Sequence, residues 1–286
     1  MSNNTPEINN PSRVYALFYS FFLIPLMITI FGVLFFFLFK MLTYEKQDPY
    51  HLLNNINSGS LTKRWQSAYE LSNLMSDVDK IPTDKLFVNQ IITMYKKSIH
   101  DDPRVRTYLA LAMGQTKNID FCSHLISGLN DEVLENRIAS IKSIGMIGCS
   151  DAASGLNSIL DPSYNNQERL ASIISLGLLK DSSSIYNLVK LLDDEEPNIR
   201  WDAAISLYKM ENYSGNNILE NLLNREYYSN YPQVDEIEID NAILTVLALI
   251  SKTSHVEFEN ELTKLAEKEK NIKIREFAMK ILIENY

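Results

Sequence analysis

The sequence is poor in the residues that most reaction chemistry requires. It has only four histidines, which lie far apart at positions 51, 100, 124 and 255. Cys122 and His124 lie close in sequence on a presumed helix, but residues at this spacing do not share a helix face, so they do not predict a metal site. No phosphate-binding loop, dinucleotide fingerprint or nucleophile-elbow motif is present. The sequence therefore predicts no metal, no cofactor and no catalytic residue.

Positive charge is the second shortage. The chain carries 27 Lys and Arg against 36 Asp and Glu, a net charge of -9. Residues 1–42 hold Arg13, Lys40 and Glu7, which leaves 25 basic and 35 acidic side chains in residues 43–286. Nucleic-acid phosphates and anionic lipid surfaces both require Lys and Arg as partners. This acidic balance argues against a nucleic-acid-binding protein and against a domain that lies flat on anionic lipid.

Cysteine is the third shortage. Cys122 and Cys149 are the two cysteines of the chain, and both fall within apolar, helix-like segments. Two cysteines do not suggest a disulfide framework. We expect both to be small buried side chains, which fits a reducing compartment.

One long apolar run lies near the N-terminus. Residues 14–39 contain no charged side chain. At ~1.5 Å per residue, a helix of this length exceeds the ~30 Å hydrocarbon core of a bilayer. A cleaved signal peptide is the alternative, but the run exceeds the usual apolar region of ~7–15 residues and no small-x-small cleavage site follows it. The sequence therefore predicts a single-pass membrane protein.

The flanks of this run suggest boundaries and an orientation. We predict a disordered tail over residues 1–13, a transmembrane helix over residues 14–42 and a linker over residues 43–58. Lys40 and Lys46 follow the apolar run, whereas Arg13 alone precedes it. Because basic residues favour the cytoplasmic side, this difference predicts a cytoplasmic C-terminal domain.

Four arginines repeat at a fixed interval in the middle of the chain. Arg106, Arg137, Arg169 and Arg200 are separated by 31, 32 and 31 residues. Counted from each arginine, positions +4 and +7 are apolar or small and position +8 is glycine in three of the four copies. Each interval also contains a second apolar segment, as in residues 121–129. A repeat of this length, with helical periodicity, predicts an all-α fold, a right-handed α-solenoid of helical pairs.

Weaker copies extend the array in both directions. Arg64 and Arg275 begin segments with the same frame, and a helix-like segment near Asp240 fits the frame without an arginine. Terminal repeats are expected to be atypical because they cap the stack. We predict a solenoid over residues 59–286, with about six or seven helical pairs.

The repeated pattern of an acidic turn, Arg, small residue and Leu-Gly resembles the HEAT-like repeats of phycobilisome lyases over about residues 59–286. The resemblance implies a binding scaffold, since only a minor subset of such arrays is catalytic. It also implies that the repeated arginine bonds carbonyls and aspartates of adjacent turns. We therefore expect a structural ladder rather than a phosphate- or carboxylate-binding site from Arg106, Arg137, Arg169 and Arg200.

Positions +2, +6 and +9 share one face of each arginine-bearing helix. This face is mixed and rich in Ala and Ser, and we interpret it as the exposed concave surface with room for a peptide or helix. The alternative is that small residues only allow neighbouring helices to approach. Trp65 and Trp201 follow an arginine directly and are either partner anchors or buried packing residues. The partner-binding candidates on this face are Gln66, Glu70, Tyr108, Asp202, Ser206 and Lys209.

Residues 224–240 break the period and form an insertion. Three tyrosines in it, Tyr227, Tyr228 and Tyr231, precede four acidic residues. Insertions in solenoids often lie on the binding face, and tyrosines give large contact areas at low entropic cost. The insertion is therefore a binding candidate, with an ordinary polar loop and a partly packed aromatic residue as the alternative.

Together these features predict a membrane-anchored adaptor. Its solenoid would bind a membrane-associated protein, for example a transporter subunit, and tethering would raise the local concentration of that partner. One alternative is an enzyme, a chromophore lyase or isomerase of the type that shares these repeats. Another is a regulatory module that binds a peptide on its concave face.

Overall fold

The computed structural model describes residues 18–42, 48–252 and 256–285. Internal contacts divide the chain into two units, with the boundary between Gln47 and Asp48. The predicted tail, residues 1–13, lies outside the described residues.

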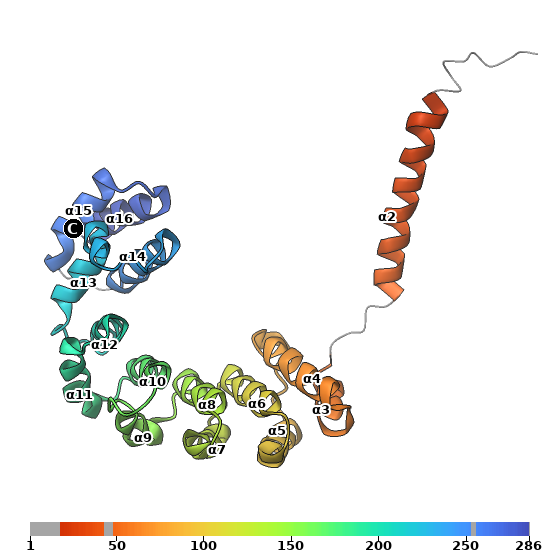
Figure 1. The fold of residues 1–286 in the computed structure, drawn as a ribbon, viewed down its shortest axis with the longest axis horizontal. Coiled ribbons are helices and arrows are strands. Elements are labelled where there is room, and N and C mark those ends of the chain that lie inside the picture. The colour runs from red at the N-terminus through yellow and green to blue at the C-terminus, as the bar shows by residue number, and fades with distance from the viewer. Residues whose placement is uncertain (1–17, 43–47, 253–255, 286) are drawn as a thin grey trace, which may run out of the picture. The chain divides into compact units, whose positions relative to one another are not determined.

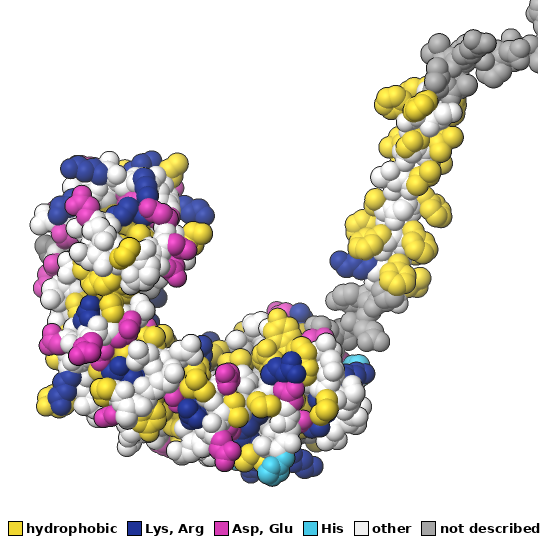
Figure 2. All heavy atoms as spheres, viewed as in Figure 1, with side chains coloured by type: hydrophobic (Ala, Val, Ile, Leu, Met, Phe, Trp, Pro, Cys, Tyr) yellow, Lys and Arg dark blue, Asp and Glu magenta, His cyan; other side chains and the backbone are white. Residues whose placement is uncertain are grey.

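In its described residues, 18–42, the N-terminal unit is a single exposed helix. A π-helical turn, Tyr19–Leu23, leads into α2, Ile24–Leu42. The combined helix has 24 residues, a mean hydropathy of 2.7 and no buried residue in the described structure. Apolar side chains cover its visible face (Figure 2). By length and composition, this helix is able to cross a membrane.

The second unit is an α-solenoid of seven helical pairs in the described residues, with no strand among them (Figure 1). The prediction of an all-α solenoid is confirmed. The inner helices lie along the concave side of the arc, and the outer helices lie behind them. The outer helices are α3 (Pro49–Ser58), α5 (Lys85–Lys97), α7 (Cys122–Ser127), α9 (Ala153–Ser158), α11 (Ile185–Lys190), α13 (Asn216–Leu223) and α15 (Glu259–Lys268). The inner helices are α4 (Leu61–Leu74), α6 (Pro103–Thr116), α8 (Leu134–Ile147), α10 (Asn166–Leu179), α12 (Pro197–Lys209), α14 (Glu236–Ile250) and α16 (Ile272–Asn285).

The predicted linker over residues 43–58 is wrong for residues 49–58, which form α3. The Asp48 side chain caps this helix by accepting a hydrogen bond from the Tyr50 N–H at 3.3 Å. Leu52, Leu53 and Ile56 are buried against the rest of the solenoid. The Asp-Pro start followed by helically spaced apolar residues is a helix signal. Residues 43–47 lie outside the described residues.

A repeated serine-glycine contact holds neighbouring inner helices together. Each serine hydroxyl donates to a backbone carbonyl of the preceding inner helix. A glycine of that preceding helix lies opposite the serine and allows the two helices to approach closely. The pairs are Ser143 to Ala110 O (2.8 Å) opposite Gly114, Ser175 to Ile141 O (2.9 Å) opposite Gly145, and Ser206 to Ile173 O (3.0 Å) opposite Gly177.

This contact makes Gly145→Ala a destabilising substitution, although alanine is the better helix former. A Cβ on Gly145 would lie 2.7 Å from Ser175 Oγ and 2.9 Å from Ser175 Cα, a backbone atom that cannot rotate away. Overpacking typically costs about 1–3 kcal/mol, against a propensity gain of about 1 kcal/mol. We expect a lower free energy of unfolding in urea titrations. Gly155→Ala is the control, because its nearest neighbour is the flexible Leu129 side chain. If Gly145→Ala and Gly155→Ala had the same free energy of unfolding, the close approach of Gly145 to Ser175 would not be important for stability.

Candidate partner-binding surface

The repeated arginines form a continuous ladder through the solenoid. Each guanidinium donates to backbone carbonyls of its own repeat, as Arg106 does to Tyr95 O at 2.5 Å and Arg200 to Asp194 O at 2.6 Å. Each also reaches a polar side chain of the next repeat. These pairs are Arg106–Asp131, Arg137–Glu168 and Arg169–Asp194, each at 2.5 Å, and Arg200–Tyr231 Oη at 3.2 Å.

Each ladder arginine uses at least two of its three guanidinium nitrogens in contacts within the chain. Burial alone would raise the pKa of Asp194, but hydrogen bonds from Arg169 and the Glu196 N–H hold that pKa below its usual range. At Asp131, burial likewise raises the pKa, but hydrogen bonds from the Val133 N–H, Asn136 and Arg106 outweigh it and lower the pKa. Both carboxylates therefore stay ionised beside their arginines.

The structure corrects the predicted register of the concave face. Position +6 is buried in α6, α8, α10 and α12, and in the last three its serine faces the preceding inner helix. In α4 the +6 residue is Glu70, which is exposed. Ser206 is 1% exposed and bonds Ile173 O, so the prediction that it lies on the exposed surface is wrong. For this position, the alternative of small residues that allow close helix approach is the correct one.

Positions +5 and +9 face away from the core instead. At 3.6 residues per turn they lie on the opposite side of each helix from the buried positions +3 and +7. On α10 these positions are Ile174 and Leu178, which are 40% and 48% exposed. On α4, Tyr69 is 46% exposed and its ring packs edge-on against Tyr108 of α6 at 5.2 Å.

These residues form an inner stripe that crosses several repeats. It consists mostly of exposed and half-buried apolar side chains, with two lysines among them. The predicted face included Tyr108, Lys209 and position +9, but it missed position +5. The signal for it was position +5, which reads Tyr, Leu, Lys, Ile and Ile in successive helices. The inner stripe comprises Tyr69, Tyr108, Leu111, Lys142, Met146, Ile174, Leu178, Ile205 and Lys209.

The other predicted candidates on this face have different surroundings. Gln66 and Glu70 are exposed on α4. Trp65, beside them, is half-buried against the core and lies beneath the Arg104 guanidinium, 4.1 Å from the ring centroid. Asp202 and Lys209 are half-buried on α12.

Asp202 is a carboxylate with no hydrogen bond or ion pair among the described residues. Burial raises its pKa to about 6, and the charge of Lys209 opposes this shift only in part. Because Asp202 is half-buried, its carboxylate is partly removed from water, and a donor from a bound molecule would stabilise it.

We expect Asp202→Asn to stabilise the protein near pH 8 and to leave its stability unchanged near pH 4. The folded-state pKa of about 6 lies above the ordinary value of 3.8, so the native chain loses stability as pH rises through this window. Urea unfolding at both pH values measures the effect. Asp151→Asn, at an exposed aspartate, is the control. If Asp202→Asn changed the free energy of unfolding by the same amount near pH 4 and near pH 8, the prediction would be wrong.

The insertion at residues 224–240 is largely packed into the body. Tyr228 is buried and donates to Leu222 O at 2.9 Å, and burial raises its pKa. Tyr227 and Tyr231 are half-buried and pack edge-on or tilted against one another and Trp201, with Trp201 and Tyr231 ring centroids 5.1 Å apart. Tyr231 takes the place that acidic residues hold opposite the other ladder arginines. These contacts correspond to the alternative of a polar loop with packed aromatics.

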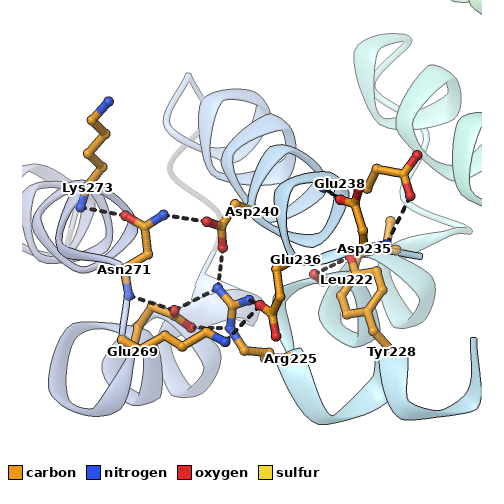
Figure 3. Close-up of polar contacts among 11 residues, drawn as sticks. Leu222, Arg225, Tyr228, Asp235, Glu236, Glu238, Asp240, Glu269, Asn271 and Lys273 are labelled. Atoms are coloured by element: carbon orange, nitrogen blue, oxygen red, sulfur yellow. Dashed lines mark hydrogen bonds and ion pairs between the residues drawn. The ribbon is translucent and has the colours of Figure 1, made fainter. Parts of the chain in front are cut away.

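The acidic residues of the insertion are used within the fold (Figure 3). Arg225 lies among Glu236 (2.8 Å), Asp240 (2.5 Å) and Glu269 (2.7 Å), which come from α14 and the turn before α16. Asp235 and Glu238 form a capping box at the start of α14. This network joins the turn after α13 to α14 and to the turn before α16, so it connects the last two helical pairs. It leaves the acidic residues little freedom to recruit a partner.

The expectation of two unpaired cysteines is wrong, because Cys122 and Cys149 form a disulfide. Their Cα atoms lie 5.6 Å apart, which falls within the usual range for the bond. The fold brings the start of α7 next to the turn that follows α8, a proximity that sequence separation does not reveal.

Comparisons with known proteins agree with this architecture. Residues 153–230 match a family model described as HEAT repeats. A search of curated proteins finds no match. Among solved structures, the chain is similar to the complex of CpcE and CpcF of phycocyanin lyase from Nostoc sp. PCC7120, with a TM-score of 0.59 and 17% identity over 85% of this chain and 89% of that chain.

Two further similar structures are more distant. A computationally designed armadillo repeat protein for modular peptide recognition has a TM-score of 0.40 and 15% identity over 83% of this chain and 99% of that chain. Human deoxyhypusine hydroxylase has a TM-score of 0.35 and 13% identity over 82% and 84%. The fold is a repeat α-solenoid in which residues 153–230 match HEAT repeats, and such an architecture is suited to protein binding.

Proposed function

We propose that this protein is a membrane-anchored adaptor that holds a partner protein on the concave side of its solenoid. The inner stripe carries this proposal. It presents large exposed apolar side chains at Ile174, Leu178 and Tyr69, on the side of the inner helices that faces away from the core. Exposed apolar patches on a folded unit typically mark protein interaction sites.

Polar groups around the inner stripe would supply specificity. Lys142 and Lys209 lie in the stripe, and Asp202 beside it holds an acceptor without a donor. Gln66 and Glu70, which are exposed on α4, would extend the surface at the first inner helix. Tyr227 and Tyr231 are half-buried beyond α12 and remain candidates at its other end. Apolar anchors surrounded by such groups are the usual composition of a binding interface.

The helix Tyr19–Leu42 would serve as a single membrane span and confine the solenoid to the bilayer surface. Confinement raises the effective concentration of a membrane-associated partner, such as a subunit of a membrane complex, without any new contact. The basic residues that flank the helix favour a cytoplasmic solenoid by a difference of one residue. The disulfide argues for the opposite side of the membrane.

Site-specific photo-crosslinking in intact cells tests the proposal. A crosslinker at Ile174 of the full-length chain should give a discrete adduct, and Ile174→Glu/Leu178→Glu should abolish co-purification of that same partner. The control is Ile119→Glu/Tyr186→Glu, at residues 72% and 68% exposed on the turn before α7 and on α11. If the control variant loses the partner equally, or if position 174 gives no adduct, the concave surface is not the binding site.

We assign no catalysis to the solenoid. The similarity to the phycocyanin lyase complex is at 17% identity and extends to the fold alone. Tetrapyrrole titration of the full-length protein is the direct test: a spectral shift that Ile174→Glu/Leu178→Glu abolishes would favour the lyase alternative over the adaptor.

A further inference from the structure

The disulfide uses every cysteine of the chain and joins two successive repeats. The sequence contains two cysteines, and none remains free. Cys122 is the first residue of α7, and Cys149 directly follows Gly148, the left-handed cap of α8. The bond therefore connects an outer helix to the turn that leads into the next repeat.

Cys149 occupies a position that serves another purpose in neighbouring repeats. The equivalent residues are Asn118 and Asp181, whose side chains accept hydrogen bonds from the turn that follows. Asn118 Oδ1 accepts from the Asp120 N–H at 2.9 Å, and Asp181 accepts from the Ser184 hydroxyl at 2.7 Å. The Cys149 side chain accepts no such hydrogen bond. It forms the cross-repeat disulfide instead, which points to a disulfide as the role of this cysteine.

A disulfide of this kind indicates the compartment. Protein disulfides form and persist in oxidising compartments, whereas thiol reductants of the cytosol keep cysteines reduced. Formation needs a disulfide-bearing carrier: one thiolate attacks the carrier disulfide, and the second then displaces the carrier as a dithiol. The carrier gains the two electrons and two protons that the thiols lose, so one S–S bond breaks as another forms.

The charges that flank the membrane helix do not oppose this assignment strongly. Arg13 precedes the apolar run, and Lys40 and Lys46 follow it, so the two sides differ by one basic residue. The excess of basic residues on one side of a membrane helix sets its orientation, and an excess of one residue gives only a weak preference. The disulfide is the stronger of the two observations.

We propose that the solenoid lies on the oxidising, extracytoplasmic side of the membrane, with the N-terminal tail in the cytoplasm. The partner held by the inner stripe is then an exported protein or the extracytoplasmic part of a membrane protein. This inference rests on the proposed anchoring by Tyr19–Leu42, but not on which surface of the solenoid binds.

Thiol trapping of the native full-length protein is the first test. Intact cells are quenched with acid and N-ethylmaleimide, then proteins are reduced and labelled with a polyethylene-glycol maleimide. The native chain should shift by two tags, one for each of its two cysteines. Cys149→Ala is the control and should not shift, because its single thiol is already blocked. A native chain that shows no shift carried free thiols in the cell, which overturns the proposal.

Labelling from outside tests the orientation separately. In the Cys122→Ala/Cys149→Ala background, a membrane-impermeant maleimide should modify Ser229→Cys, at an exposed solenoid residue, without lysis. It should modify Ser12→Cys only after lysis. Protease added to the same cells should digest the native solenoid, which keeps the test valid if the variant folds poorly. The reverse pattern, or protection of the native solenoid, overturns the proposal.

Two outcomes separate this inference from the proposed function. Recovery of the chain in the soluble fraction would refute the anchor and with it the orientation. A membrane-bound, oxidised and externally labelled chain that fails to form the Ile174 adduct would keep the orientation and refute the concave binding surface.

Discussion

Arg169→Met should lower the free energy of unfolding by about 3–5 kcal/mol, the cost typical of leaving a buried charge without its partner. The Arg169 side chain is 3% exposed and bridges Leu160 O, at 3.0 Å, to the Asp194 carboxylate of the next repeat. Methionine fills much of the volume but supplies no donor. Asp194 then stays buried at the base of the following repeat and loses the side-chain donor that holds its pKa down.

The pH dependence of this variant distinguishes a lost ion pair from lost packing. In the native chain, burial alone would raise the pKa of Asp194, yet its hydrogen bonds lower it. The stabilisation is therefore present above the unfolded pKa of about 3.9 and is lost as pH falls through the folded value. In Arg169→Met this acid-induced loss should shrink. Urea unfolding between about pH 3 and pH 7 measures both effects.

Arg104→Met is the matched control. The Arg104 side chain is 54% exposed and pairs with Asp102 at 2.6 Å within one turn. Exposed ion pairs contribute about 0–1 kcal/mol, so this variant should remain close to the native stability. If Arg169→Met proved as mild as Arg104→Met, the ladder would not be an essential element of the solenoid.

Removing the disulfide should lower the free energy of unfolding by about 3–4 kcal/mol, the chain-entropy value for a loop of this length. The two cysteines are 27 residues apart, and their bond restricts the unfolded chain over α7 and α8. Cys122→Ala/Cys149→Ala and reduction of the native protein should have the same effect. Solenoid repeats contact mainly their neighbours, so hydrogen exchange should rise most in α7, α8 and α9.

Reductant provides the internal control for this prediction. It should destabilise the native protein and leave Cys122→Ala/Cys149→Ala unchanged, because the variant has no further cysteine to reduce. If the native and reduced chains had the same free energy of unfolding, the disulfide would not stabilise the fold. A loss of stability that reductant also produces in the variant would indicate another cause.

Several features of the solenoid could be predicted because they depend on local periodicity. Arginines near 31-residue spacing, with apolar residues at +4 and +7, define helices that cannot bury their faces alone, and stacking is the only way to cover them. The binding face could not be assigned this way. A helix wheel shows that +2, +6 and +9 share a side, but Ser206 is buried on that side because the preceding helix approaches through Gly177.

The sequence by itself determined the repeat, the helical content and the apolar N-terminal segment, since each follows from residue periodicity and composition along the chain. Only the tertiary structure decided the rest. Distances between residues in different repeats decide whether Tyr231 is free for a partner or replaces an acidic residue opposite Arg200. They also decide whether Cys122 and Cys149 form a disulfide. Those distances are set by how successive helical pairs stack, which no local pattern encodes.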